Sequence, residues 1–402
     1  MDSIQHKASN SSSLAPVSRW TASWRAAMQC LNDPLVAYPY VVPRLDGVTL
    51  RQSVKLRNSG SAVRVWLSNQ YGSRPIHIGA AYIAPASAEG AHAGPGAAIT
   101  FAENAGIVIA AGTQWVSDPI ELSAGADSTW LVSLYIERAD EAARTLHRQG
   151  SETAWLSAPG NFAADEAFEH EQTLDCRYIL SGVDVLDSTT RSVLVAIGDS
   201  ITDGDGSTAG SYGRWTDQAA ARLRSLSPTG LCVVNNGISG GRLLYCGYGD
   251  ALLARFDRDV LAVPGVTAVF VLCGLNDLYM PASLRSPAEQ IDDRILCAAL
   301  AQVRDRARGH GLKVYAGTLT PTGGTAGLFD YYSVTGESHR KAVNHWLRNT
   351  AGFDGIADFD AALSDPGDPT RLNARFDSGD HLHLNDAGYG VMADTVVEMF
   401  QR

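Results

Sequence analysis

The apolar run from Val193 to Ile197, which ends abruptly in Gly198, Asp199 and Ser200, limits the fold of this chain more than any other segment. A strand that is apolar at every position is buried on both faces, as in a parallel sheet covered by helices. Such sheets bind ligands just beyond the carboxyl ends of their strands. The run therefore predicts that Ser200 is presented as a nucleophile, although Asp199 and Ser200 could equally cap the next helix.

Strand-like and helix-like segments alternate after residue 190. Strands are predicted at 231–235, 266–273 and 313–317, and helices at 211–226, 251–263, 287–309, 339–348 and 385–401. This alternation predicts a parallel, doubly wound α/β sheet. We place a boundary at 187–191 and predict an α/β domain over residues 188–402.

The chain before this boundary shows the pattern of successive strands. Strands are predicted at 49–57, 62–69, 76–83, 106–110, 115–122 and 130–137, with turn residues at intervals of about 8–12 residues. We predict an all-β sandwich of jelly-roll-like type over residues 20–187. Residues 1–19 are polar at the start and are predicted to be a disordered tail.

Composition narrows the possible partners and the compartment. The net charge of −11 argues against nucleic acid and against an anionic membrane surface, because both attract basic patches. No apolar run approaches the roughly 20 residues of a membrane helix, and no secretory signal is visible, so we expect a cytoplasmic protein. The six cysteines are scattered without a CxxC pair, which argues against a zinc site. The oligomeric state is left open.

Polar residues in four loops of the predicted α/β domain supply the groups that ester hydrolysis needs. Ser200 offers a hydroxyl, and His383 is a suitable base because its ordinary pKa lies near neutrality. Asp380, three positions earlier, can orient the imidazole of His383. Gly240 exposes a backbone N–H, and the Asn276 amide and the Ser200 N–H complete a possible oxyanion hole.

Four segments resemble, in the same order, the sequence blocks of the SGNH (GDSL) hydrolase family. They are Gly198–Gly204 (GDSITDG), Gly240, Gly274–Asn276 (GLN) and Asp380–His383 (DHLH). The resemblance implies a flavodoxin-like three-layer α/β/α fold and acyl transfer without a metal or other cofactor. It also implies a Ser200–His383–Asp380 triad, with Gly240 and Asn276 as oxyanion donors. The β-rich N-terminal part is similar to a domain that some bacterial members carry.

Two residues compete with the proposed nucleophile and base. Residues 237–241 (GISGG) match the GxSxG nucleophile elbow, so Ser239 is an alternative to Ser200. The paired glycines there look more like a loop that offers backbone N–H groups. His381 lies next to His383, but the Asp-x-x-His spacing favours His383.

Other polar and aromatic residues are expected to have structural roles. Asp203 and Asp277 are interpreted as loop-stabilising hydrogen-bond partners, and Trp66 and Trp130 as packing residues of strands. His147 could approach the active site from the N-terminal domain.

The substrate is expected to be a short acyl ester, with acetyl esters of an alcohol or carbohydrate as the first choice. The sequence contains no long apolar lid segment that would favour long lipid chains. Lysophospholipase, thioesterase and sugar acyltransferase activity at the same site stay open. A non-catalytic carbohydrate-binding protein would be expected to lack a catalytic residue, and none is missing.

Overall fold

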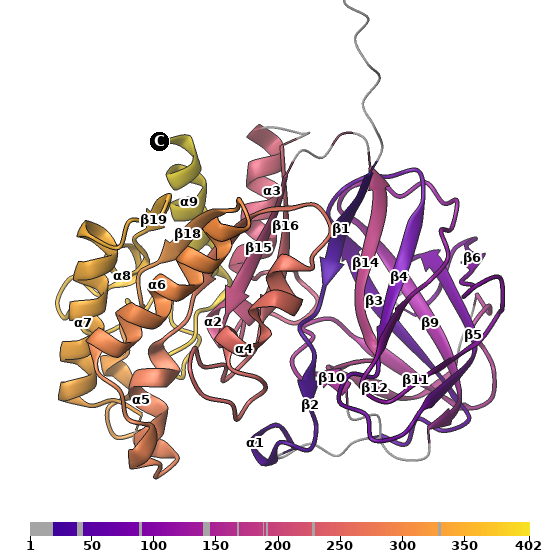
Figure 1. The fold of residues 1–402 in the computed structure, drawn as a ribbon, viewed down its shortest axis with the longest axis horizontal. Helices are drawn as coiled ribbons and strands as arrows, with labels where there is room; N and C mark the ends of the chain where they lie inside the picture. The colour runs from indigo at the N-terminus through magenta and orange to yellow at the C-terminus, as the bar shows by residue number, and fades with distance from the viewer. Residues whose placement is uncertain are drawn as a thin grey trace, which may run out of the picture.

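The computed structural model describes residues 19–37, 43–87, 91–139, 145–166, 169–187, 189, 192–226, 230–328 and 331–402. The predicted tail at residues 1–19 lies outside this part except for its last residue, and so do residues 188, 190 and 191 at the predicted boundary. The division into 20–187 and 188–402 therefore stays a prediction. Figure 1 shows a β-rich N-terminal part beside a C-terminal part in which helices surround a sheet.

Five parallel strands form the centre of the C-terminal part. They are β15 (Ser192–Gly198), β16 (Leu231–Gly237), β17 (Val266–Leu272), β18 (Lys313–Gly317) and β19 (Gly355–Ala357), in the order β16-β15-β17-β18-β19. Residues 193–198 of β15 are all buried, as the uninterrupted apolar run predicts. The predicted parallel sheet is confirmed. The pattern did not reveal β19, because this strand has only three residues and two of them are half-buried.

Two groups of helices cover the sheet. The first group is α3 (Trp215–Leu226), α8 (Phe359–Leu363) and α9 (Asp386–Gln401), and the second is α4 (Leu252–Phe256), α5 (Leu275–Ser283), α6 (Asp293–Gly309) and α7 (Val334–Asn349). In the first group α9 packs against α3 and α8, and in the second α6 packs against α4 and α7. The three-layer α/β/α fold that the resemblance implies is therefore present.

The predicted helices have shifted bounds in the structure. The helix predicted at 211–226 begins at Trp215, and the one predicted at 339–348 begins at Val334. Two others are interrupted. The helix predicted at 251–263 is α4, which continues as a π-helical turn, Asp257–Leu261. The helix predicted at 287–309 begins with a short 3₁₀ turn, and α6 starts only at Asp293. The backbone is extended at Gln290, and the Asp292 side chain caps α6 by accepting the N–H of Ile295 at 2.9 Å.

The N-terminal part consists of antiparallel sheets, which confirms the β-rich prediction. One sheet has the order β1 (Arg19–Arg25), β14 (Leu180–Asp187), β4 (Val63–Ser68), β8 (Gln114–Val116). The largest has the order β12 (His170–Leu174), β11 (Ala154–Pro159), β3 (Val48–Leu56), β9 (Ser128–Ala139), β5 (Ile76–Pro85), β6 (Ala97–Ala98), with β7 (Ile107–Ile109) also on β5. A small sheet joins β13 (Arg177–Tyr178), β10 (Thr145–His147) and β2 (Gln29–Cys30), and α1 spans Pro34–Ala37.

The two larger sheets share one hydrophobic core. Alternate residues of β4, such as Val63 and Val65, and alternate residues of β3, such as Leu50 and Val54, are fully buried in the same cluster. The period of two that predicted these strands therefore marks the faces that the sheets turn toward each other.

The strand predicted at 115–122 is wrong in length, because β8 ends at Val116. Pro119 lacks the N–H that would continue the ladder. The side chain of Asp118 instead accepts hydrogen bonds from the Ala102 and Glu103 N–H groups, at 3.0 and 2.8 Å. The chain is thereby held in a loop before a single bridge forms at Ile120.

The N-terminal part packs against the edge of the parallel sheet through β1 and β16, as Figure 1 also shows. The Ala22 N–H donates to the Pro264 carbonyl at 2.9 Å. Buried charges cross the same boundary, since Glu152 pairs with both Arg177 and Arg214. Among the helices of the described residues, none combines the length and apolarity needed to cross a bilayer.

Candidate active site

The loop after β15 places Ser200 at the start of α2 (Ser200–Asp203). Asp199 caps this helix by accepting the N–H of Ile201 at 3.1 Å. The Ser200 carbonyl accepts N–H groups from Gly204 and Asp205, at 2.8 and 3.0 Å, which closes the helix after one turn. Of the two roles considered for this segment, capping therefore belongs to Asp199, and the Ser200 hydroxyl remains available for other contacts.

Ser200, His383 and Asp380 form one hydrogen-bonded chain. His383 Nε2 lies 2.8 Å from Ser200 Oγ, and His383 Nδ1 lies 2.5 Å from Asp380 Oδ2. The other carboxylate oxygen, Asp380 Oδ1, accepts the backbone N–H of His383 at 2.8 Å. Because an ionised carboxylate can only accept, Nδ1 carries the proton and Nε2 faces the serine hydroxyl as an acceptor. Residues 183 positions apart in the chain are thus joined directly.

The surrounding charges and hydrogen bonds favour an ionised Asp380 next to a protonated His383. Burial alone would raise the pKa of Asp380, but the hydrogen bond from His383 outweighs it, and the pKa lies well below its usual range. Burial alone would likewise lower the pKa of His383. The hydrogen bond to Asp380 and the charges of Asp205, Asp380 and Asp199 outweigh burial, so the pKa of His383 is raised above 6.5.

Gly240 and Asn276 are held by contacts that suit oxyanion donors. Gly240 has a positive φ of 74°, and a Cβ at this position would lie 2.4 Å from the Tyr248 ring, so only glycine fits. Asn276, in the first turn of α5, donates one N–H to the Gly241 carbonyl at 2.9 Å and accepts the Tyr331 hydroxyl at 2.8 Å. These two bonds fix the amide orientation and leave its second N–H available. Tyr331 stands outside any motif, so the sequence held no signal for it.

The two acidic residues interpreted as loop stabilisers have that role. Asp277 accepts the backbone N–H groups of Leu243 and Leu244 at 2.7 and 3.0 Å, which fixes the loop that carries Gly240. Asp203 accepts the N–H of Ser239 at 2.8 Å on the same loop. Burial raises the pKa of Asp277 to about 6.

The alternative nucleophile and base lie in different surroundings. The Ser239 hydroxyl donates to Asp205 Oδ2 at 2.6 Å, and the described residues place no imidazole against it. His381 is paired with Asp377 at 2.5 Å and has a φ of 65°. Neither residue belongs to the Ser200 chain.

His147 crosses from the N-terminal part toward α2, as considered from the sequence, but it reaches Asp203 and not Ser200. Its Nε2 lies 3.1 Å from Asp203 Oδ1, and its Nδ1 lies 2.9 Å from the Ala27 carbonyl. Burial alone would lower the pKa of His147, but the charge of Asp203 outweighs it and the pKa is raised. His147 therefore anchors the N-terminal part beneath the candidate site.

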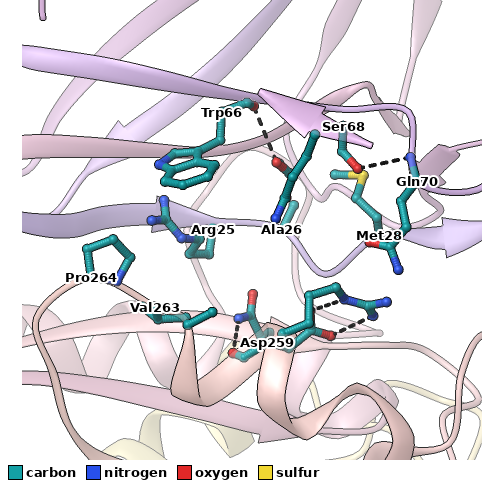
Figure 2. A pocket seen from close by; sticks show the side chains of 14 residues that line it. Arg25, Ala26, Met28, Trp66, Ser68, Gln70, Asp259, Val263 and Pro264 are labelled. Atoms are coloured by element: carbon teal, nitrogen blue, oxygen red, sulfur yellow. Dashed lines mark hydrogen bonds and ion pairs between the residues drawn. The ribbon is translucent and has the colours of Figure 1, made fainter. Parts of the chain in front are cut away.

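Figure 2 shows a separate crevice of about 80 Å³ between the two parts of the chain. Its charged groups are paired, since Arg25 contacts Asp184 and Arg258 contacts Asp259. The guanidinium carbon of Arg25 lies over the Trp66 ring, 5.9 Å from the ring centroid. The Trp66 Nε1–H donates to Asp184 at 2.7 Å. Trp66 thus packs between strands, as interpreted from the sequence. Ser200 is not among the residues that line this crevice.

Comparison with known proteins finds a matching family model and several similar solved structures. Residues 196–391 match the model of the GDSL-like Lipase/Acylhydrolase family. An acetylxylan esterase from Geobacillus stearothermophilus is 21% identical, over 53% of this chain and 95% of its own, with a TM-score of 0.41. A GDSL-like lipase from Bacteroides thetaiotaomicron is 15% identical, over 52% and 88%, with a TM-score of 0.39. An α/β hydrolase from the metagenome of Lake Arreo, Spain, is 20% identical, over 53% and 96%, with a TM-score of 0.42. No curated protein matches the chain.

The family match identifies an enzyme of the hydrolase class, and the three-layer fold places the residues described above at the ends of its strands. Within the chain, residues 196–391 correspond to a GDSL-like lipase/acylhydrolase domain. The roles of Ser200, His383, Asp380, Gly240 and Asn276 within that domain stay predictions.

Proposed function

We propose that this protein is a serine esterase that releases short acyl groups, acetyl first among them, through Ser200, His383 and Asp380. The observation that carries the proposal is the continuous chain from Ser200 Oγ to His383 Nε2 at 2.8 Å and from His383 Nδ1 to Asp380 at 2.5 Å. A nucleophile next to a base that is oriented by a third group is the arrangement that covalent acyl transfer requires.

The proposed reaction has two steps that use the same groups. Ser200 Oγ attacks the ester carbonyl while its proton passes to His383 Nε2, and His383 then gives this proton to the departing alcohol. Water attacks the acyl-enzyme in the same way and releases the acid. The N–H groups of Gly240, Asn276 and Ser200 would receive the oxyanion, and each donor of this kind typically contributes about 10²- to 10³-fold in rate.

The pH dependence of turnover follows from the raised pKa of His383. The imidazole accepts the serine proton only when it is neutral, so kcat/KM should fall as the pH drops through the pKa of His383. Because that pKa lies above 6.5, we expect the acidic side of the profile to be centred above pH 6.5. Measuring kcat/KM for p-nitrophenyl acetate from about pH 5 to 9 checks this, and a midpoint below 6.5 would contradict it.

A groove of about 590 Å³ supports a carbohydrate ester as substrate, with the sugar lying beside the catalytic groups, since Ser200, His383 and Asp380 are not among its described lining residues. One end is formed by Gly210 and Tyr212, in the loop that follows α2, and the rest by the β-rich part. Hydroxyl groups supply most of its polar lining, from Ser53, Ser87, Ser128, Thr129, Thr153 and Tyr212. The charged residue in the described lining, Glu152, is neutralised by Arg177 and Arg214. Such a lining, with Trp155 as a further aromatic ring, suits an uncharged sugar better than a phospholipid headgroup.

The substrate proposal is tested with an acetylated oligosaccharide, p-nitrophenyl acetate and p-nitrophenyl octanoate. We expect both acetyl esters to be hydrolysed faster than the octanoate. Trp155→Ala should raise KM for the oligosaccharide and leave p-nitrophenyl acetate unaffected. Trp115→Ala is the matched control, because this tryptophan is 43% exposed and lies outside the groove.

Three outcomes would redirect the assignment. Preference for the octanoate or for a lysophospholipid would indicate a lipase-like role, and preference for a thioester would indicate a thioesterase. Transfer of acetyl to an added sugar, seen by mass spectrometry, would indicate an acyltransferase. An unchanged KM in Trp155→Ala would remove the groove from the substrate site.

A further inference from the structure

A second carboxylate, that of Asp205, faces the reactive nitrogen of His383. Asp205 Oδ2 lies 3.9 Å from His383 Nε2, on the side opposite to Asp380, and its side chain is only 13% exposed. The backbone of Asp205 is fixed at both ends of the residue, since its N–H donates to the Ser200 carbonyl at 3.0 Å and its carbonyl accepts the Tyr389 hydroxyl at 2.6 Å. The position of this carboxylate is therefore set by the same short helix that presents Ser200.

Neighbouring side chains hold the carboxylate at a distance from the imidazole. The Ser239 hydroxyl donates to Asp205 Oδ2 at 2.6 Å. The Gln149 amide, with its nitrogen turned toward the carboxylate, donates to Asp205 Oδ1 and also lies 2.7 Å from Oδ2. Arg148 lies beside them, 3.4 Å from Ser239 Oγ. With these donors the carboxylate can stay ionised without bonding to Nε2, which remains free for Ser200.

We propose that Asp205 is a positioning residue of the active site, whose negative charge stabilises the protonated form of His383 during turnover. Ser239, Gln149 and Arg148 keep that charge close to Nε2 but out of direct hydrogen-bond contact. The inference rests on the proposed role of His383 as the base. It gives Ser239 of the GISGG segment a function other than nucleophile, and it gives the N-terminal part a direct contact with the residues that surround the base.

Several other titratable or charged groups lie near Asp205 and His383 and also affect the pKa values of these two residues. They are Asp380 before α9, Asp199 and Asp203 at the two ends of α2, Arg148 from the N-terminal part and Tyr389 on α9. Burial raises the pKa of Asp205 to about 6, and its carboxylate is therefore charged in the range where an esterase with a neutral imidazole works. Its two donors and Arg148 support the charged form.

The test is the pH profile of Asp205→Asn. An ionised carboxylate raises the proton affinity of His383, so its removal should move the acidic side of the kcat/KM profile to lower pH. Opposite charges at about 4 Å interact strongly enough to shift a pKa by between about one and three units, depending on the local dielectric. We expect a shift of at least about one unit, and NMR titration of the His383 ring should show the same change. A purely structural role would lower activity without moving either midpoint.

Asp386→Asn is the matched control. Asp386 accepts the Thr208 N–H at 2.8 Å and so braces the same loop from α9, but no contact with His383 is found in the described residues. Its profile should keep the wild-type midpoint. If Asp205→Asn folds poorly, Asp205→Ser, which is smaller and can still bond to Ser239, should show the same shift.

The outcomes separate this inference from the proposed function. A midpoint that is unchanged, or moved to higher pH, in a folded Asp205 variant overturns the role of Asp205 while wild-type esterase activity stands. A wild type that shows no turnover and no reaction at Ser200 overturns the proposed function itself, and the role of Asp205 with it.

Discussion

Replacing Ser200 with alanine should lower kcat/KM for p-nitrophenyl acetate by about 10⁴-fold or more, because the proposed acyl-enzyme forms on the Ser200 hydroxyl. The same variant should fail to react with a fluorophosphonate, whereas the wild type should gain one label by intact mass. Circular dichroism should show an unchanged fold, since within the described residues the Ser200 side chain makes one hydrogen bond, to His383. The two measurements together identify the nucleophile.

Ser239→Ala is the control for this experiment, because Ser239 is the serine of the competing GxSxG segment. The variant should still be labelled once, since its hydroxyl is bonded to Asp205 and not to an imidazole. Labelling that is lost only in Ser239→Ala would move the nucleophile to the loop after β16. A folded wild type that is not labelled at all would favour a non-catalytic binding protein.

Replacing Glu152 with alanine should destabilise the whole chain by about 3–5 kcal/mol, because the buried Arg177 guanidinium would lose its carboxylate and Arg214 would keep only Asp217. Glu152 contacts Arg177 from β13 at 2.7 Å and also pairs with Arg214, just before α3. The Glu152 side chain is 4% exposed and that of Arg177 is fully buried, so the guanidinium of Arg177 is shielded from bulk water. Urea unfolding followed by tryptophan fluorescence measures the change.

Two further variants help to interpret the loss of stability in Glu152→Ala. Glu152→Gln keeps an acceptor oxygen and should be less destabilising than the alanine variant, which separates the hydrogen bond from the charge. Glu121→Ala removes an exposed carboxylate from the same β-rich part and should change the free energy of unfolding by less than about 0.5 kcal/mol. Equal stability of Glu152→Ala and wild type would show that this ion pair does not hold the two parts together.

The elements with strong periodicity could be predicted from the sequence, and those shaped by single residues could not. The run in β15 and the alternation in β4 each have a burial pattern that a local segment reveals by itself, whereas β3 is buried at every residue except Lys55. In contrast, β8 ends early because of Asp118 and Pro119, and α6 starts late because the backbone is extended at Gln290. These breaks depend on particular hydrogen bonds and not on hydrophobic period.

Some features of the candidate site could likewise be predicted from the sequence, and others could not. The sequence alone determined the parallel sheet, the segment that presents Ser200 and the residue types of a hydrolase, because an apolar strand followed by a short polar loop is a local property. Only the tertiary structure decided which residues meet. It placed His383 against Ser200, turned Ser239 toward Asp205, and brought His147 and Glu152 from the β-rich part to the helices that follow β15. Contacts of this kind join residues far apart in the chain, and they depend on how whole sheets pack, which no local pattern encodes.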